Sequence, residues 1–360
     1  HGKKKGRVKL MTLEEAVKEI RPLDKKAMDI AEKRWNSIAK PLHSLGKMEK
    51  LVIQIAGITE SPDIQIKKKA LVAMCADNGV VEEGVTQTGQ EVTAIVAENF
   101  LTGDTSACVM CRQCGTDVYP VDVGMAVDTG VSTEFKVRYG TRNMTKEPAM
   151  TREEAVKAIE AGIEMVRRLK EKGYGILATG EMGIGNTTTS SAVASVLMGR
   201  PVEEMTGRGA GLSSDGLKRK IQAIKKAVEQ NRPDPSDPLD VLSKVGGLDI
   251  AGLAGVFLGG AAFRIPVVMD GFISCTAALA AQRICPGSAD YMIASHVSKE
   301  PAAELILNAL QKEAVIHGEM CLGEGSGAVA LFPFLDMGAA VYQSMSTFED
   351  IKVDQYKELV

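Results

Sequence analysis

Short apolar segments that end in turn-forming residues recur along this chain, and segments with a helical pattern separate them. The run Ala70–Ala76 has the length of a buried strand and precedes Asp77-Asn78-Gly79, which favours a turn. A second run, Gly175–Thr179, leads into a glycine-rich stretch. Further strands are expected at Asp117–Val123, Val267–Asp270, Tyr291–Ser295 and Val329–Leu331. Strands that alternate with helices predict an α/β fold, with a mainly parallel sheet covered by helices on both faces.

The helical segments have recognisable boundaries. Thr151 and Glu154 form a capping box before an apolar stripe, and Gly173 ends that helix. The pattern at Lys47–Gly57 stops on glycine, which predicts a helix end there. The other expected helices are Leu13–Ile20, Ala27–Ile38, Glu91–Leu101, Thr105–Cys114 and Thr188–Met198, and the Pro-rich segment Asn231–Pro238 is expected to be a surface loop.

Charge and hydropathy exclude several classes of partner. The net charge is −3, from 43 Lys and Arg against 46 Asp and Glu, so the chain has no basic surplus for a nucleic acid or an acidic membrane. The best candidate for a membrane span, Ile250–Phe263, has 14 residues, whereas a span takes roughly 20. Seven cysteines, an odd number, indicate a reducing, cytoplasmic compartment.

The N-terminal segment, residues 1–10, is basic and has no apolar stretch. It therefore lacks the pattern of a secretion signal. We interpret it as a remnant of an expression tag and leave it out of the fold. The 360 residues are then enough for one large domain with a small appendage, or for two medium domains.

A glycine-rich stretch, Thr179–Thr189 (TGEMGIGNTTT), stands where a predicted strand ends and a helix begins. Open α/β sheets bind ligands at such positions, and the N–H groups and hydroxyls of a helix start suit phosphate. The stretch is not a P-loop, and its order G-x-x-G-x-G differs from the dinucleotide fingerprint. A glycine turn is the simpler interpretation. Glu181 within the stretch instead favours a ligand that carries hydrogen-bond donors as well as an anionic group.

Two more segments are typical of contacts with a sugar phosphate. Thr206–Gly211 (TGRGAG) surrounds Arg208 with glycines, and Lys220 lies in the basic segment that follows. Asp270 ends a predicted strand and precedes glycine, so it either holds sugar hydroxyls or caps the next helix. The alternative for the first segment is a turn before an ordinary basic helix.

Two further segments offer acid–base groups. Ser295–Ser298 (SHVS) could bind phosphate or transfer protons, but a Ser-His-Asp hydrolase is disfavoured because the chain has no G-x-S-x-G elbow. Gly323–Gly327 (GEGSG) presents Glu324 between glycines, next to an apolar run. Apolar neighbours raise the pKa of a carboxyl toward neutrality, which suits a general base. A solvated loop glutamate is the alternative.

Three cysteines follow one another at a spacing of three: Cys108, Cys111 and Cys114. This resembles part of the ligand run of an iron–sulfur cluster, but a fourth ligand at the right spacing is missing. Such positions also share one side of a helix, where cysteine packs as a small apolar residue. We favour the packing role. No cluster in the sequence has convincing zinc spacing.

Taken together and in this order, the motifs resemble one family, the nicotinate-nucleotide–dimethylbenzimidazole phosphoribosyltransferases, which make the lower nucleotide of cobamides. The resemblance covers Pro41–Phe334. The matching stretches are PLHSLGKMEKL, ADNGV, EGVT, QEVT, GEMGIGNTTT, TGRGAGL, VGGLDIAGLAG, MDGFI, SHVS and GEGSGA. It implies a homodimer with a Rossmann-like large domain, here 61–334, and a smaller helical domain made of 11–60 and 335–360.

The chain departs from the family pattern at three places. Asn78 stands where histidine is common, and Asp249 stands where glutamate is usual. The segment Thr86–Gly89 replaces a Ser-Ala-Tyr/Phe-Pro pattern. Because this last segment lies near the expected pocket for the incoming base, it bears on which base is accepted and not on the type of reaction.

The resemblance also implies a reaction. A nitrogen of 5,6-dimethylbenzimidazole attacks C1′ of nicotinate mononucleotide, nicotinate leaves, and α-ribazole 5′-phosphate forms with inversion. The leaving pyridine needs no proton, so one base suffices, and Glu324 has the position of the family's base. Positioning of two substrates and one base requires no metal or other cofactor.

The remaining site residues follow from the same resemblance. Glu181 would lie near the reacting centre as a second catalytic residue, where it would orient the substrate or share the role of base. Asp270 would lie near the ribose, and Gln90 in the pocket of the aromatic base. The residues expected to hold phosphate, ribose and the nicotinate carboxylate are Gly183, Gly185, Asn186, Thr187, Gly207, Arg208, Gly209, Lys220 and Ser298.

Several alternatives stay open on the sequence. A nucleotide-dependent oxidoreductase would need an acidic residue about 20 positions after the glycines, which Glu203 and Glu204 meet only loosely. An iron–sulfur protein and a non-catalytic nucleotide-binding module are the other classes. Within the transferase class, a purine or a phenolic compound could replace the benzimidazole as acceptor.

Overall fold

Five parallel strands form the centre of the molecule, in the order β2-β1-β3-β4-β5. They are β1 (Lys69–Ala76), β2 (Thr116–Gly124), β3 (Ile176–Met182), β4 (Val267–Met269) and β5 (Met292–Ala294). The computed structural model describes residues 10–357, so the expected tag remnant lies outside the described residues except for Leu10. The predicted α/β fold with a parallel sheet is confirmed. Pro120, which has no N–H group, lies in the edge strand β2.

The helices alternate with the strands along most of the chain. They are α1 (Leu13–Glu19), α2 (Lys25–Ser37), α3 (Lys47–Thr59), α4 (Glu91–Thr102), α5 (Ser106–Gln113), α6 (Arg152–Glu171), α7 (Asn186–Met198), α8 (Val202–Met205), α9 (Ser214–Asn231), α10 (Pro238–Val245), α11 (Leu248–Ala262), α12 (Phe272–Ile284), α13 (Ala303–Ala309) and α14 (Ser326–Ser344). Short 3₁₀ turns occur at Gly79–Glu83, Thr133–Phe135 and Pro286–Tyr291. No helix within residues 10–357 is long and apolar enough to cross a bilayer.

Alternate residues of the strands face two different buried clusters. In β1, Val72 and Met74 belong to one cluster, whereas Leu71 and Ala73 belong to the other. The same alternation occurs in β4, where Val267 belongs to the first cluster and Val268 to the second. Because successive side chains of a strand point to opposite faces, the two clusters mark the two faces of the sheet. Both faces are therefore covered by helices, as the sequence predicts.

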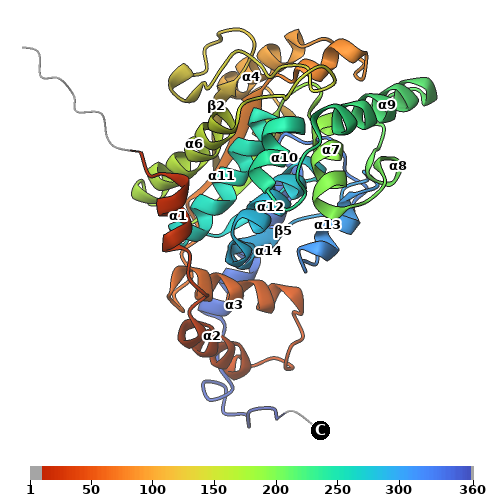
Figure 1. Ribbon diagram of the computed structural model, residues 1–360. Helices are drawn as coiled ribbons and strands as arrows, with labels where there is room; N and C mark the ends of the chain where they lie inside the picture. The colour runs from red at the N-terminus through yellow and green to blue at the C-terminus, as the bar shows by residue number, and fades with distance from the viewer. Residues whose placement is uncertain (1–9, 358–360) are drawn as a thin grey trace, which may run out of the picture.

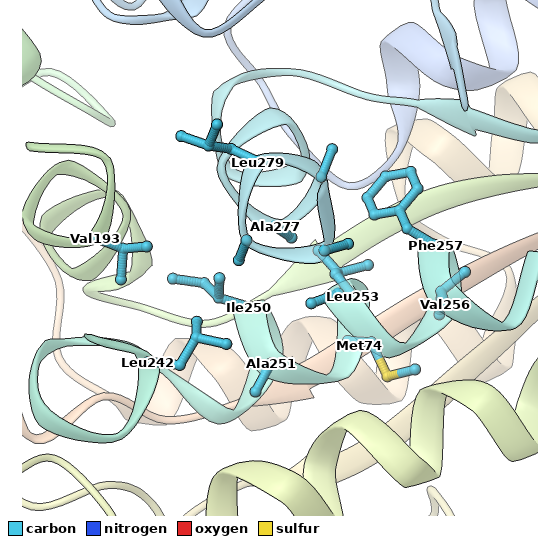
Figure 2. Close-up of a cluster of buried hydrophobic side chains, with 14 of the residues drawn as sticks. Met74, Val193, Leu242, Ile250, Ala251, Leu253, Val256, Phe257, Ala277 and Leu279 are labelled. Atoms are coloured by element: carbon cyan, nitrogen blue, oxygen red, sulfur yellow. The ribbon is translucent and has the colours of Figure 1, made fainter. Parts of the chain in front are cut away.

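The first face packs against α11, whose described side chains are almost all buried. Figure 2 shows Leu253 and Phe257 of this helix beside Ala277 of α12 and Met74 of β1. Helix α6 lies against α11, and a Cβ added at Gly255 would come within 1.9 Å of the Ile159 backbone oxygen. Backbones this close explain why an apolar segment of α11 is rich in glycine: it packs between the sheet and α6 and does not span a membrane.

The second face packs against α14, α5 and α3, and α2 extends the same cluster into a helical lobe below the sheet (Figure 1). Segments far apart in the sequence meet there. Ile38 forms an antiparallel bridge with Thr347, and the Phe348 N–H donates to the Ser37 backbone oxygen at 2.9 Å. These two contacts join one segment within 11–60 to one within 335–360.

The boundaries expected for that lobe differ from the architecture in two respects. The limit at 334/335 falls inside α14, which runs without a break from the sheet into the lobe. Helix α1 packs on α6 and α11, and its Leu13 belongs to the first cluster. The lobe therefore shares a helix and a buried cluster with the sheet.

Two predictions about elements are wrong. The segment Val329–Leu331, expected to be a strand, lies in α14. Short apolar runs fit a buried helix as well as a buried strand, and this one continues as helix through Pro333. Helix α3 also passes through Gly57 and ends at Thr59, followed by Glu60 in the left-handed conformation. Gly57 is instead a contact point, because a Cβ there would lie 2.7 Å from Met28 side-chain atoms.

Candidate active site

A cavity of about 310 Å³ lies at the carboxyl ends of β3, β4 and β5. Its walls come from the loops that follow these strands and from the segments 85–88, 208–212 and 321–324. This is the edge at which parallel α/β sheets bind ligands. The predicted site residues that line it are Glu181, Gly183, Gly185, Asn186, Thr187, Arg208, Gly209, Asp270, Ser298 and Glu324. Gln90, Gly207 and Lys220 lie outside the lining.

Glu324 occupies a strained backbone position at the wall of this cavity. Its φ is +63°, and Gly323 and Gly325 on either side have φ of +88° and +91°. Three successive left-handed residues turn the chain sharply just before α14 begins. A non-glycine residue in this region costs of order 1–3 kcal/mol, and such strain clusters at functional sites. The glycines therefore do more than expose Glu324: they let the turn form at all.

The carboxylate of Glu324 rests on the N-terminus of α5. The Ala107 N–H donates to Glu324 Oε2 at 3.2 Å. Burial raises the pKa of Glu324 above its ordinary value, and the α5 backbone hydrogen bonds partly oppose this. The side chain is half-buried, which keeps one edge of the carboxylate accessible from the cavity. A carboxylate with a raised pKa in a cavity wall is a suitable proton acceptor.

Asp270 caps α14 and not α12, the helix that follows it. Its Oδ1 accepts from the Gly327 and Ala328 N–H groups at 2.7 and 3.1 Å. Its Oδ2 accepts from the Gly325 N–H at 3.1 Å. The sequence offered two roles, sugar contact or a cap on the next helix. The structure shows a cap on a helix that begins 56 residues later, next to Glu324.

Glu181 is a second buried acid of the cavity wall. Burial, with Asp249 and Asp270 nearby, raises its pKa to about 8. Asn186 Nδ2 donates to Glu181 Oε2 at 2.5 Å and to Asp249 Oδ2 at 3.1 Å. Asp249, at the start of α11, is also fully buried, and burial raises its pKa to about 7. Near neutral pH this pair holds a proton, so Glu181 can donate a hydrogen bond into the cavity.

Strand β3 is longer than predicted and continues to Met182, so the first residues of the glycine-rich stretch belong to the strand. Gly183 then passes so close to β1 and to the start of α11 that a Cβ would lie 2.5 Å from the Ala76 backbone oxygen and 2.3 Å from Asp249 Oδ2. Gly185 stands at the N-cap of α7, and the helix starts at Asn186. The stretch thus directs the N-terminus of a 13-residue helix at the cavity, a favourable place for an anion.

Lys220 lies directly behind this wall. Its Nζ donates to Thr187 Oγ1 at 2.7 Å and to the Gly207 backbone oxygen at 3.2 Å. The side chain is completely buried, and burial lowers its pKa to about 8. Thr187, which lines the cavity, therefore connects the lysine to it. The exposed Arg208 guanidinium donates to the Leu212 backbone oxygen at 2.7 Å, within its own loop.

The segment that departs from the family pattern forms part of the cavity wall. Thr86, Gln87 and Thr88 line the cavity, and Gln87 Nε2 donates to the Gly211 backbone oxygen across it. Gln90 instead points away and donates to the Asn78 backbone oxygen at 3.1 Å. Gln90, which the resemblance places in the pocket of the aromatic base, thus lies outside the cavity lining, whereas residues 86–88 belong to it.

His296 and Ser295 do not form a nucleophilic pair. The Ser295 hydroxyl donates to the Met269 backbone oxygen at 2.5 Å, so it accepts from His296 Nδ1 at 3.0 Å. Burial lowers the pKa of His296. The imidazole is therefore neutral with its proton on Nδ1, and the hydroxyl is not activated for attack.

The three spaced cysteines lie on α5 and at its end. Cys108 and Cys111 are buried in the second cluster, and burial raises the pKa of Cys111 to about 12. A thiol with such a pKa stays protonated, whereas a metal ligand must be a thiolate. Cys114 is partly buried, and its Sγ lies 3.9 Å from the Val329 backbone oxygen. These contacts support the packing role.

The sequence does not single out two residues at this site as functional. Glu300 lines the cavity and accepts from the Gly209 N–H at 3.0 Å. Asp249, whose carboxylate accepts from Asn186, stands out in the sequence only as a departure from the family pattern. Glu300 follows the SHVS motif by two positions, but no spacing in the sequence relates it to the glycine loop 91 residues away. Contacts of this kind arise only from the folded chain.

Comparisons with known proteins agree with this geometry. A family model for phosphoribosyltransferases matches residues 20–353. The nicotinate-nucleotide–dimethylbenzimidazole phosphoribosyltransferase of Ruminiclostridium cellulolyticum is 53% identical over 351 residues, covering 97% of this chain and 100% of the relative. The protein of that name from Clostridium acetobutylicum is 48% identical over 353 residues, with 97% and 100% covered. The crystal structure of CobT from Thermus thermophilus matches with a TM-score of 0.86 and 37% identity, covering 92% of this chain and 100% of that one.

Proposed function

Since the chain belongs to the nicotinate-nucleotide–dimethylbenzimidazole phosphoribosyltransferase family, we propose that Glu324 is the general base of its reaction. The protein is a pentosyltransferase that moves the phosphoribosyl group of a nicotinate nucleotide to dimethylbenzimidazole. The observation that carries the proposal is the position of Glu324: a half-buried carboxylate with a raised pKa, on a strained turn in the cavity wall.

The reaction then proceeds in one displacement at the ribosyl carbon. One nitrogen of the benzimidazole attacks C1′, and the bond from C1′ to the nicotinate nitrogen breaks, with its electron pair returning to the pyridine. The second ring nitrogen loses its proton to Glu324. Attack on the face opposite the leaving group inverts C1′ and gives the α-nucleotide. Alignment of the two substrates in one cavity lowers the barrier, because the enzyme meets the entropy cost on binding.

Other residues of the cavity would orient the substrates. Glu181, with its pKa of about 8, is protonated near neutral pH and can donate to a substrate oxygen. The α7 N-terminus, Thr187 and Ser298 line the region suited to the phosphate, with Lys220 behind Thr187. The apolar side chains that can contact the aromatic rings include Val85, Val96, Met182, Phe272 and Leu322.

The variant Glu324→Gln tests the base. Glutamine keeps the acceptor oxygen for the Ala107 N–H but cannot take a proton, so turnover should fall by about 10²–10⁴-fold while the melting temperature changes little. Release of nicotinate from nicotinate mononucleotide in the presence of dimethylbenzimidazole is the measurement. Glu181→Gln is the matched comparison and should lose less, because Glu181 already carries its proton. Full activity of Glu324→Gln would refute the assignment.

We also propose dimethylbenzimidazole as the preferred acceptor. The apolar lining supports an uncharged fused aromatic ring, and Thr86 and Thr88 give the same wall a polar edge. A competition among dimethylbenzimidazole, adenine and a simple phenol, read by product mass, checks this. A predominant purine or phenolic nucleotide would overturn the preference and leave the reaction class intact.

We propose, finally, that the enzyme acts as a homodimer in the cytoplasm. The seven cysteines are all free, which suits a reducing compartment. Large apolar side chains are exposed at Ile95, Leu101 and Val127, as expected of a surface that another copy covers. Light scattering at micromolar concentration should give twice the chain mass.

A further inference from the structure

The cavity contains a carboxylate in the region that suits the phosphate. Glu300 Oε1 accepts from the Gly209 N–H at 3.0 Å, and Gly209 belongs to the loop that the sequence assigns to phosphate binding. Ser298, another candidate ligand of the phosphate, lines the cavity two residues before Glu300. A negative side chain thus bonds to a backbone donor that an incoming anion would use.

The second oxygen of this carboxylate is poorly satisfied. Glu300 Oε2 is buried and has no hydrogen-bond partner among the described residues. It approaches the backbone of the same loop so closely that a Cβ at Gly207 would lie 2.0 Å from it. A buried carboxylate oxygen without a donor is costly, so this arrangement needs a compensating reason.

The compensation comes from a buried cation. Lys220 is completely buried, and its Nζ bonds to the Gly207 backbone oxygen and to Thr187. Between them, Glu300 and Lys220 contact the short loop Gly207–Gly209 through Gly209 N–H and Gly207 oxygen. The negative charge of Glu300 therefore offsets part of the cost of the buried ammonium.

We propose that Glu300 is an internal occupant of the phosphate subsite, which the 5′-phosphate of the nucleotide substrate displaces. The inference rests on the proposed function, because that function places a phosphate beside this loop. A phosphate and a carboxylate cannot share one backbone donor and one buried cation without like-charge repulsion. When the phosphate binds, Glu300 leaves the Gly209 N–H, and the phosphate takes over as acceptor and counter-charge.

The displacement of Glu300 determines the affinity of the site for a phosphate. A substrate must displace a charge that already neutralises the site, so part of its binding free energy is used for that exchange. Ligands without a phosphate have nothing to exchange. Removal of the Glu300 charge should thus strengthen the binding of phosphate-bearing ligands alone.

Calorimetric titration of the full chain with ribose 5-phosphate and with ribose, and with nicotinate mononucleotide and nicotinate riboside, tests the proposal. Glu300→Gln removes the charge and keeps an acceptor oxygen for the Gly209 N–H, whereas Glu300→Ala removes both. Both variants should bind the phosphorylated ligands about tenfold more tightly, equivalent to ~1.4 kcal/mol, with no gain for ribose or the riboside. Glu304→Gln, an exposed glutamate on α13, is the control for net charge and should behave as the parent.

Other outcomes overturn the proposal. Unchanged affinity in Glu300→Gln with weaker binding in Glu300→Ala would mean that Glu300 only supports the loop. Weaker binding in both would mean that it contacts the substrate directly. Because binding is measured without turnover, absence of transferase activity would count against the proposed function and not against the displacement.

Discussion

Three acids of one cavity differ in their surroundings, and the differences separate their roles. Glu324 is half-buried and accepts a hydrogen bond from a helix N-terminus. Glu181 is buried near Asp249, and Asn186 donates to both. The two oxygens of Asp270 accept from three backbone N–H groups. A carboxylate that accepts several backbone donors is held in place and serves as a support. Glu324, which is half-buried and accepts fewer backbone donors, is the acid that suits the base proposed above.

The buried pair Glu181 and Asp249 makes stability depend on pH. Their pKa values in the folded protein, about 8 and about 7, lie above the ordinary values of 4.5 and 3.8. The folded chain therefore keeps protons that the unfolded chain has released. This contribution to stability is complete below pH 4 or so and is lost as the pH rises through 7 and 8.

Asp249→Asn should flatten that dependence. The free energy of unfolding in urea should fall less between pH 5 and pH 8.5 in the variant than in the parent, by on the order of 2 kcal/mol. Asp215→Asn, at an exposed position on α9, is the comparison and should keep the parental slope. Parallel curves for Asp249→Asn and the parent would show that Asp249 is ionised in the folded chain throughout.

At the scale of residues, the sequence identifies candidate site residues better than it identifies their hydrogen-bond partners. The sequence identifies Glu324 as a candidate site residue, because glycines flank this single acid in a short motif. It does not identify the partners of Asp270 and Glu300, because they lie 55 to 58 and 91 residues away. Gln90 was placed by its motif, yet its side chain bonds to Asn78 outside the cavity lining.

At the scale of elements, the N-terminus of α14 joins the sheet to the cavity. Asp270, at the end of β4, holds the first turn of the helix, and Glu324 lies two residues before the helix begins. The position of the proposed base thus depends on a cap from a distant strand. The wrong prediction for Val329–Leu331 has the same origin, since the sequence shows neither this cap nor the helix packing that buries the run.

Asp270→Asn should therefore impair both stability and turnover. An amide offers one acceptor oxygen and places N–H donors against a backbone N–H, so about 1–3 kcal/mol of the free energy of unfolding should be lost. Displacement of the turn should lower turnover by at least roughly tenfold. Urea unfolding and nicotinate release are the measurements. Thr151→Ala, which removes the cap of α6, should cost about 1 kcal/mol without a loss of turnover; equal turnover in both variants would contradict the link.

Helices α6 and α11 pack very closely. Among the glycines at helix–helix contacts in the described chain, the shortest distance from an added Cβ to the partner helix occurs here. Gly255→Ala would place a methyl group 1.9 Å from the Ile159 backbone oxygen, and α11 packs on the sheet on its other side. We expect a loss of about 1–3 kcal/mol or more in urea unfolding. Gly287→Ala, where the nearest atom is a side-chain carbon at 3.6 Å, should change stability little. Equal effects would show that the helices can separate freely.

For the whole molecule, the sequence predicts two regions, and the two-region layout is visible in Figure 1. Alternation of strands and helices was sufficient for the parallel sheet, because the local patterns of all five of its strands agree with the fold. The extent of the lobe was harder to predict, since a helix that serves both regions has no boundary signal. Buried residues such as Trp35 in the lobe and Leu71 in the sheet belong to one continuous cluster.

A continuous cluster predicts that lobe and sheet unfold together. Trp35, the single tryptophan, is buried in the lobe with its ring centroid 5.4 Å from that of Tyr342 on α14, so its fluorescence reports on the lobe alone. Circular dichroism reports on all helices. Because Trp35 and Tyr342 belong to the same buried cluster as Leu71 and Val268 of the sheet, the two signals should show one transition at the same urea concentration. A fluorescence midpoint clearly below the dichroism midpoint would mean that the lobe melts first, and that Trp35 and Leu71 are buried independently.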